Sequence, residues 1–322
     1  MSIQPLRAAV AALLGVLAAC AAQGPVSVVN GGTPRAVRDI PIDDTQVYPE
    51  SLSSTRDGTL YVGSIKGVVY RAQPGDAKAT AWVRPDAANG LLSVYGVLVH
   101  EPSQTLWLCS VPNGFAPPVA GAVTSLVALD LATGAPKARH VFPGARSVCN
   151  DISLGPDGSV YATDTSGGRV LRLRRGASLL EVFAEDEQLK GADGLAFDAS
   201  GRLYVNIVTR GALLRVEQSA GSFKRLVPIK VDAPLGGPDG MRLVSGSRFL
   251  LAEGTTGRID ELMVSGDTAH VRVLREGLNS SPGVTLVGRT AYAIEGKIGY
   301  LIDPKLKGQD PGPFIIRAIP LD

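Results

Sequence analysis

Apolar and polar residues alternate in six short stretches of the chain, and these stretches recur every 43 to 55 residues. Counted from a fixed starting residue, the third position is apolar in all six stretches and the fifth position in most of them. A period of two is typical of β-strands and not of helices. The six starting residues are Glu50, Tyr95, Asn150, Asp193, Asp239 and Pro282.

Each start is followed by further strand-like segments. Asp57-Gly58 and Asp157-Gly158 predict tight hairpins after the first strand. The second strands share a column of large side chains, which we interpret as packing between neighbouring repeats. Several strands in a repeat of this length are typical of a β-propeller. We therefore predict an all-β fold over residues 35–322, a six-bladed β-propeller with four-stranded antiparallel blades.

The two ends of the predicted propeller compete for one position in the ring. The segment IGYLID, residues 298–303, is expected to be the third strand of the last blade. Both RAVRDIPI, residues 35–42, and FIIRAIPL, residues 314–321, have the pattern of the outermost strand that would complete this blade. Either arrangement would close the ring and remove an exposed edge.

Composition and charge argue against nucleic acid as a partner. The 322 residues have a net charge of +2 and are 45% hydrophobic, which suits a large core and gives no basic groove for nucleic acid. We expect a monomer that binds a small molecule.

The N-terminus has the pattern of an export signal. After Arg7, an apolar stretch from Ala8 to Ala19 is too short to span a membrane as a helix. It ends in Leu17-Ala18-Ala19-Cys20, which resembles the lipobox of bacterial lipoproteins. This resemblance implies a signal peptide over residues 1–19, a lipid anchor on Cys20, a tether over residues 20–34, and a periplasmic protein held on a bacterial membrane. Ordinary cleavage near Cys20, which releases a soluble periplasmic protein, is the alternative.

Two further cysteines, Cys109 and Cys149, fall near one rim of neighbouring repeats. A disulfide between them and two buried free thiols both fit the sequence, because the pattern does not give the Cα separation.

Four of the six starting residues carry an oxygen ligand. Because the repeats share one phase, Glu50, Asn150, Asp193 and Asp239 should meet near the axis. Asp-Gly pairs often form turns, but Asp193 and Asp239 lie about seven residues ahead of their own hairpins, so we interpret them as lining one face. The alternative is that they only bind loop backbone. Carboxylates so close repel unless a cation or a proton neutralises them. All-oxygen ligands favour Ca²⁺, then Mg²⁺ or Mn²⁺, over zinc.

Three segments resemble a known family. CNDISLGPDGSVYATD, GADGLAFDASGRLYV and GGPDGMRL, with YPES ahead of them, are similar to the family of regucalcin, gluconolactonase and luciferin-regenerating enzyme. They are more distantly similar to diisopropyl fluorophosphatase, the paraoxonases and strictosidine synthase. The resemblance implies a six-bladed propeller with one divalent cation bound by Glu50, Asn150, Asp193 and Asp239. It also implies that Asp239 is the base or nucleophile and that Asn150 helps to place the substrate.

The chain departs from this family at positions that matter for the substrate. Val148 stands where gluconolactonase-type members can carry an arginine, which argues against a sugar-acid lactone, and Tyr95 stands at the position of the paraoxonase histidine. His100 and His140 are expected to be surface or packing residues. Residues near the predicted rim that either bind substrate or cap loops are Tyr95, Asn206, Glu253 and Glu295.

The leading hypothesis is a metal-dependent hydrolase of lactones or related esters, in which Asp239 takes a proton from the attacking water. The alternative is a non-catalytic periplasmic propeller that binds a ligand or protein and holds a structural metal. The sequence leaves open whether the insertion at residues 112–122 covers the site.

Overall fold

The structure is a computed structural model that describes residues 37–321. These residues belong to one compact unit, Thr33–Asp322. The predictions for the signal peptide, Cys20 and the tether lie outside the described residues. Within residues 37–321, no helix is both long enough and apolar enough to cross a membrane.

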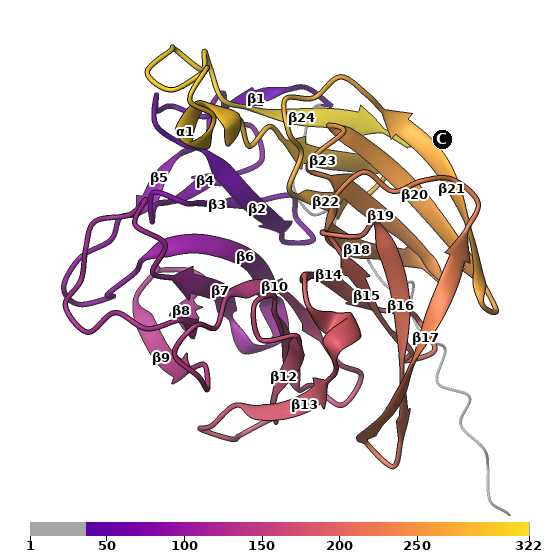
Figure 1. Cartoon of the computed structure of the whole chain (residues 1–322). Helices are drawn as coiled ribbons and strands as arrows, with labels where there is room; N and C mark the ends of the chain where they lie inside the picture. Colours follow the sequence, from indigo (N-terminus) through magenta and orange to yellow (C-terminus); the bar gives the residue numbers. More distant parts are fainter. Residues whose placement is uncertain (1–36, 322) are drawn as a thin grey trace, which may run out of the picture. The chain divides into compact units, whose positions relative to one another are not determined.

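The described chain is an all-β fold of short antiparallel sheets (Figure 1). The first sheet contains β2 (Pro49–Ser54), β3 (Leu60–Ser64), β4 (Val69–Ala72) and β5 (Thr80–Val83). The second contains β6 (Ser93–His100), β7 (Thr105–Val111), β8 (Ser125–Asp130) and β9 (Pro136–Val141). The third contains β10 (Cys149–Leu154), β11 (Val160–Asp164), β12 (Arg169–Leu173) and β13 (Glu181–Glu185). The predicted hairpins are present, and Gly58 and Gly158 have the positive φ angles, 96° and 76°, that such turns require.

The next eight strands form one continuous sheet. Its first half is β14 (Ala192–Phe197), β15 (Leu203–Ile207), β16 (Ala212–Ser219) and β17 (Ser222–Val231). Its second half is β18 (Pro238–Ser245), β19 (Arg248–Glu253), β20 (Arg258–Ser265) and β21 (Thr268–Arg275). Each half is an antiparallel meander, and a short parallel pairing of Lys230 with Thr268 and of Val231 with Ala269 joins the two outer edges. This pairing covers the end of one edge strand and the start of the other.

The last sheet joins the two ends of the described chain and shows which of them forms its outermost strand. Its strands are β22 (Val284–Val287), β23 (Thr290–Ile294), β24 (Ile315–Pro320) and β1 (Ile40–Pro41), in that order. Ile40 pairs with Ile316, so the N-terminal segment is outermost and the C-terminal segment is the third strand.

The prediction that residues 298–303 form a strand is wrong. These residues include a short helix, α1 (Gly299–Ile302). Lys297, just before it, has a positive φ of 52° and therefore cannot continue the extended strand that ends at Ile294. The Lys297 ammonium donates to the carbonyl oxygens of Pro311 and Pro313, at 2.6 and 2.8 Å, which ties the following loop to this bend. Single 3₁₀ turns lie at Glu101–Ser103 and Glu187–Leu189.

The first strands surround a common centre. Strands β2, β6, β10, β14, β18 and β22 contact one another in this order, and β22 contacts β2 (Figure 1). Apolar clusters fill the spaces between neighbouring sheets. Tyr161 of β11, for example, packs edge-to-face on Phe197 of β14 with ring centroids 4.9 Å apart. The large residues of the second strands therefore pack between sheets, as predicted, and each contributes about 1.5–3 kcal/mol by burial.

Candidate active site

The predicted ligands occupy equivalent places in four strands. Glu50, Asn150, Asp193 and Asp239 are each the second residue of β2, β10, β14 and β18. In all four strands, and at Tyr95 in β6, the pairing with the following strand shifts register at this point. Such an irregularity is a β-bulge, which bends a strand and re-aims a side chain. The bulges therefore account for the convergence of the five side chains at one end of the ring.

Close backbone packing explains the glycine that follows three of these residues. A Cβ atom on Gly194 would collide with the carbonyl oxygen of Asp239, and one on Gly240 would lie 2.8 Å from the carbonyl oxygen of Pro282. A Cβ atom on Gly96, which follows Tyr95, would likewise collide with the backbone of Asn150 in β10. None of the three has a positive φ angle, so glycine serves close approach here and not a turn. The Asp-Gly pairs are therefore not hairpin turns, in agreement with the sequence analysis.

Asn150 and Asp193 are joined directly. The Asn150 amide Nδ2 donates to Asp193 Oδ2 at 2.8 Å and to the Thr165 hydroxyl at 3.1 Å. The carboxyl groups of Asp193 and Asp239 are close enough that each affects the pKa of the other. Its other oxygen, Oδ1, is buried and has no hydrogen-bond partner among the described residues. A buried carboxylate oxygen without a donor is costly unless a cation or a proton occupies the space beside it.

The electrostatics of the carboxylates favour a bound positive charge. Burial raises the pKa of Asp193 to about 7, and the charge of Asp151 also raises it. Burial, together with the charge of Asp193, raises the pKa of Glu50 and of Asp239 well above their ordinary values. Carboxyl groups with pKa values raised in this way take up protons unless a cation is bound. Their all-oxygen chemistry and the unpartnered Asp193 Oδ1 fit a hard divalent cation.

The carboxylates are not already gathered as a finished metal cage. Within residues 37–321, no three His, Cys, Asp or Glu side chains stand at the spacing of a metal site. Asp193 is buried, whereas Glu50 and Asp239 are only partly buried. Glu50, Asp193 and Asp239, with Asn150, are the residues that would hold a cation here.

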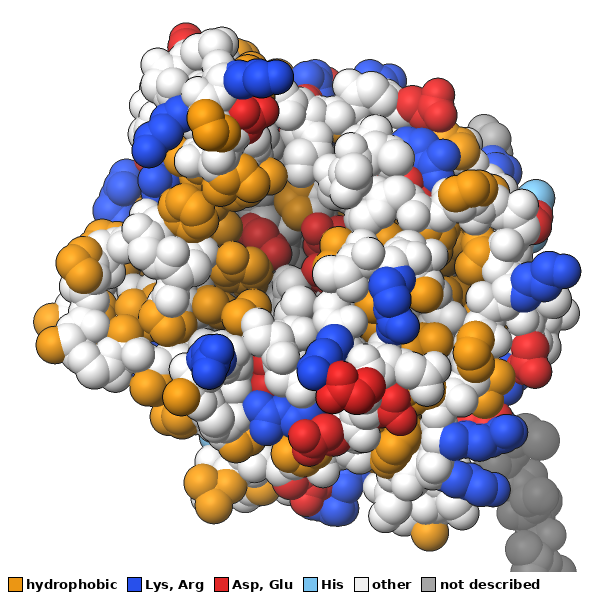
Figure 2. All heavy atoms as spheres, viewed as in Figure 1, with side chains coloured by type: hydrophobic (Ala, Val, Ile, Leu, Met, Phe, Trp, Pro, Cys, Tyr) orange, Lys and Arg blue, Asp and Glu red, His pale blue; other side chains and the backbone are white. Residues whose placement is uncertain are grey.

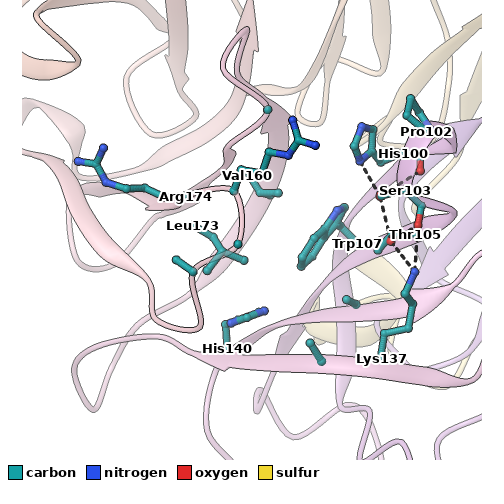
Figure 3. Close-up of a pocket in the computed structure, with 16 residues that line it drawn as sticks. His100, Pro102, Ser103, Thr105, Trp107, Lys137, His140, Val160, Leu173 and Arg174 are labelled. Carbon is teal, nitrogen blue, oxygen red and sulfur yellow. Dashed lines mark hydrogen bonds between the residues drawn. The ribbon is translucent and has the colours of Figure 1, made fainter.

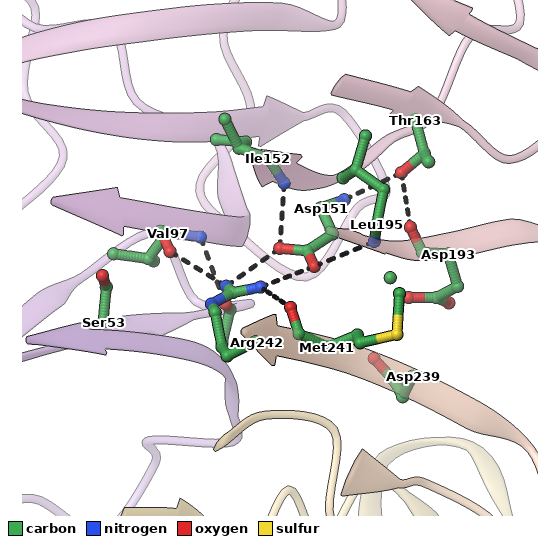
Figure 4. Close-up of polar contacts among 12 residues, drawn as sticks. Ser53, Val97, Asp151, Ile152, Thr163, Asp193, Leu195, Asp239, Met241 and Arg242 are labelled. Carbon is green, nitrogen blue, oxygen red and sulfur yellow. Dashed lines mark hydrogen bonds and ion pairs between the residues drawn. The ribbon is translucent and has the colours of Figure 1, made fainter. Parts of the chain in front are cut away.

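A buried ion pair, missed in the sequence analysis, lies beside these residues (Figure 4). The Arg242 guanidinium binds Asp151 through two contacts, of 2.7 and 3.0 Å, and also donates to the carbonyl oxygen of Val97 at 3.2 Å. Asp151 accepts the backbone N–H of Ile152 at 2.9 Å. The pair links β10, β18 and β6 across the centre of the ring. Arg242 is the one charged residue at the fourth position of the six repeats, and that was the available signal.

The face of the molecule seen in Figure 2 is hollowed near its centre. Figure 2 shows acidic side chains within the hollow and hydrophobic side chains along one side of it. Tyr95 is half-buried, and burial raises the pKa of its phenol, as do the charges of Glu50, Asp193 and Asp239. The hydroxyl of Tyr95 accepts a hydrogen bond from Asn113 Nδ2 at 3.0 Å. Asn113 belongs to the insertion at residues 112–122, whose base therefore lies against the site.

Three other predicted substrate contacts are engaged with the protein itself. Asn206 accepts from the Gly194 N–H at 3.0 Å and donates to the carbonyl oxygen of Asp239 at 2.5 Å. Glu253 binds Arg258 at 2.9 Å, and Glu295 binds Arg317 at 2.6 Å. All of these partners lie in neighbouring strands. A substrate role for these three residues stays a prediction.

His100 and His140 line a different cavity, of about 610 Å³, between the second and third sheets (Figure 3). His100 is the last residue of β6, whose opposite end carries Tyr95. His140 Nδ1 contacts the carbonyl oxygen of Ser178 at 2.8 Å, and His100 Nδ1 contacts the Ser103 hydroxyl at 2.7 Å. The structure thus keeps both histidines away from the carboxylates.

The structure also shows how Cys109 and Cys149 are paired. Cys109 and Cys149 form a disulfide, with Cα atoms 5.2 Å apart. Cys149 immediately precedes Asn150, so the disulfide fastens the start of β10 to β7.

Comparisons with known proteins agree with this fold. A family model described as strictosidine synthase-like, N-terminal, matches residues 35–72. No curated protein sequence matches the chain. A gluconolactonase from Xanthomonas campestris, by its description important in glucose secondary metabolic pathways, is similar in structure, with a TM-score of 0.63 and 16% identity over 88% of this chain and 91% of the other.

Two further solved structures are similar. A luciferin-regenerating enzyme has a TM-score of 0.64 and 14% identity, over 88% of this chain and 95% of the other. A virginiamycin B lyase from Staphylococcus aureus has a TM-score of 0.56 and 11% identity, over 88% of this chain and 98% of the other. The fold is therefore a β-propeller, and the resemblance to gluconolactonase and luciferin-regenerating enzyme stated from the sequence is confirmed at the level of the fold.

Proposed function

We propose that this protein is a Ca²⁺-dependent hydrolase of lactones or related esters, built on six four-stranded blades if the eight-stranded sheet is counted as two. The observation that carries the proposal is the convergence of Glu50, Asp193 and Asp239 with the Asn150 amide, on strands that surround a common centre. Raised carboxyl pKa values in a cleft are typical of sites that bind cations or move protons. Mg²⁺ and Mn²⁺ are the alternative cations.

The chain's own residues supply the remaining chemistry. A bound divalent cation would favour the ionised carboxylates and polarise the carbonyl group of the substrate. Asp239, which is partly exposed, accepts the proton of the attacking water. Asn150, oriented by its hydrogen bonds to Asp193 and Thr165, keeps its amide oxygen free to position substrate or cation. The Asp151–Arg242 pair holds β10 and β18 in place beneath these groups.

Export and membrane anchoring complete the proposal. The lipobox-like Leu17-Ala18-Ala19-Cys20 supports cleavage before Cys20 and lipidation of that cysteine, which would place a monomeric propeller on a bacterial membrane, in the periplasm. Mass spectrometry of the protein from the membrane fraction should give a lipid-modified N-terminal Cys20, and a Cys20→Ser variant should lose the modification. An unmodified N-terminus after residue 19 or 21 would contradict the anchor.

Activity is tested with the form that starts after Cys20. It is assayed against γ- and δ-lactones, aryl esters and a fluorophosphate, with calcium or with a chelator. We expect calcium-dependent turnover that is lost in Asp239→Asn and kept in Glu276→Gln, a control that removes an exposed carboxylate which has no contact in the described structure. No turnover, together with a calcium-dependent rise in melting temperature, would reject the hydrolase and favour the non-catalytic binding protein.

A further inference from the structure

The cavity lined by His100 and His140 is separate from the proposed active site (Figure 3). It lies between the second and third sheets, and none of the proposed cation ligands lines it. His100 is the last residue of β6, whereas Tyr95, at the active site, is the third. The volume of about 610 Å³ is enough for a small organic molecule.

The register of the second sheet explains why this space is open. Trp107, Ala128 and Ala138 are directly paired across β7, β8 and β9, so their side chains share one face of the sheet. The two alanines are too small to fill the space beside the indole ring. Val160 and Leu173, which are paired with each other in the third sheet, also line the cavity. The middle of the cavity is therefore flanked by one aromatic ring and two aliphatic side chains.

A second ring extends the aromatic wall. The imidazole of His140 lies 6.0 Å from the indole of Trp107, measured between ring centroids. His140 Nδ1 donates to the carbonyl oxygen of Ser178 at 2.8 Å, and this hydrogen bond holds the imidazole in place. A flat apolar group of a ligand would lie along these two rings.

The ionisable side chains around this centre are all basic. They are His100, Lys137, His140, Arg174 and Arg175, and no aspartate or glutamate lines the cavity. Arg174 is paired at 2.9 Å with Glu181, which lies outside the lining. The Lys137 ammonium donates to three neutral oxygens, two backbone carbonyls and the Thr105 hydroxyl, at 3.0 to 3.1 Å. Lys137 has no ion pair among the described residues, although its charge acts on Asp130, outside the lining.

Arg175 carries the charge that is most available to a ligand. It is exposed in the loop after β12, and among the described residues its guanidinium has no hydrogen bond or ion pair. Burial lowers the pKa of His100, and the charge of Arg175 lowers it further, which places the guanidinium near this imidazole. A carboxylate in the cavity would therefore meet Arg175 without displacing an acidic residue. Charge-assisted hydrogen bonds of this kind are stronger than neutral ones.

From these observations we propose that the cavity is a second binding site, which takes a small organic carboxylate with a flat aromatic body. The aromatic body lies against Trp107 and His140, and the carboxylate points toward Arg175 and Lys137. The inference does not depend on the proposed hydrolase function, because binding here uses none of the residues of that site and is measured without catalysis.

The test measures binding of phenylacetate by calorimetry. Chelator is present, so that no cation at Glu50, Asp193 and Asp239 can bind the carboxylate. Phenylacetamide has the same shape without the charge, and acetate has the charge without the ring. We expect phenylacetate to bind at least about tenfold more tightly than either. Trp82→Phe leaves Trp107 as the only tryptophan, and its fluorescence should change with the same midpoint as the calorimetric titration.

Arg175→Gln should remove most of the preference for phenylacetate over phenylacetamide. Arg289→Gln is the matched control and should keep this preference, because Arg289 is exposed in the hairpin between β22 and β23 and does not line the cavity. Equal affinity for phenylacetate and phenylacetamide, an equal loss in the two variants, or neither heat nor a fluorescence change with phenylacetate would overturn the inference. Acetate that binds as tightly as phenylacetate would also overturn it, because a simple anion site would explain that result.

Discussion

Burial of the Asp193 carboxylate, together with repulsion from Asp151, predicts that Asp193 destabilises the metal-free protein. Asp193 has a pKa of about 7 in the folded protein, against an ordinary value of 3.8. Between these two pH values the folded state holds a proton that the unfolded state has released. The free energy of unfolding therefore falls as pH rises from about 4 to about 7, and the loss is complete above pH 7.

Asp193→Asn isolates this effect, because it removes the charge and nearly keeps the shape. The asparagine oxygen can still accept the Asn150 hydrogen bond, and its new N–H group stands near the unpartnered Oδ1 position and Asp239. A pKa near 7 in place of 3.8 corresponds to a cost of at most about 4 kcal/mol at pH 8, and to less than about 2 kcal/mol at pH 5. We expect the variant to be more stable than the wild type at pH 8 in chelator, by a large part of that amount.

Urea unfolding at pH 8 and pH 5, in chelator and in calcium, measures these differences. In chelator, the advantage of the variant should shrink on going to pH 5. In calcium, the order should reverse at pH 8, because the wild type keeps a cation ligand that the variant has lost. If Asp193→Asn in chelator destabilises the protein equally at both pH values, the carboxylate is not under electrostatic stress and the reasoning is refuted.

Three other predictions concern the framework of the site. Arg242→Met should destabilise the protein by about 3–5 kcal/mol in urea unfolding, because it leaves the Asp151 carboxylate buried without its partner. Adding Asp151→Asn to the same chain should restore part of the lost free energy of unfolding, whereas no loss in Arg242→Met would mean that water solvates Asp151. Removing the disulfide with Cys109→Ser and Cys149→Ser should cost about 2–4 kcal/mol in thermal and urea unfolding, because the unfolded chain loses a link between residues 40 positions apart; an unchanged free energy of unfolding would refute this stabilising role. Gly194→Ala should lower both calcium affinity and the free energy of unfolding, because the new Cβ would push on the Asp239 backbone. Gly283→Ala, where the nearest atoms are 3.1 Å from the new Cβ, should disturb calcium binding less, and equal effects at both positions would refute the close-packing argument.

Much of the fold could be predicted from the sequence because the repeats share one phase. Alternating apolar positions identified the first strands, and glycines at the hairpins identified the turns. The last sheet was predicted less well. The IGYLID segment has strand-like composition, but the backbone at Lys297 turns into a positive φ before it, and that conformation is not visible in a hydrophobic pattern.

The convergence of Glu50, Asp193 and Asp239 was predictable from the same phase, because each residue is second in its strand. The bulges that aim these side chains inwards were not, since a register shift depends on pairing with the next strand. In the sequence, the glycines after Asp193 and Asp239 are the local feature that reflects this bulged, closely packed backbone. They were identified as lying outside the hairpins, but the reason for them, contact with the backbone at the start of the next repeat, needed coordinates.

The Asp151–Arg242 pair shows which part of a site remains out of reach of the sequence. The two residues are 91 positions apart, and either one alone would be an ordinary polar residue on a strand. Only closure of the ring brings them together. Arg242 lowers the pKa of Glu50 while Asp151 raises it, so the pair sets the charge balance of the carboxylates as well as their position. A substitution that kept the ion pair but reversed its direction, with arginine at position 151 and aspartate at position 242, should therefore fold and yet shift the pH dependence of calcium binding, because the positive charge would move from β18 to β10, beside Asn150 and Asp193.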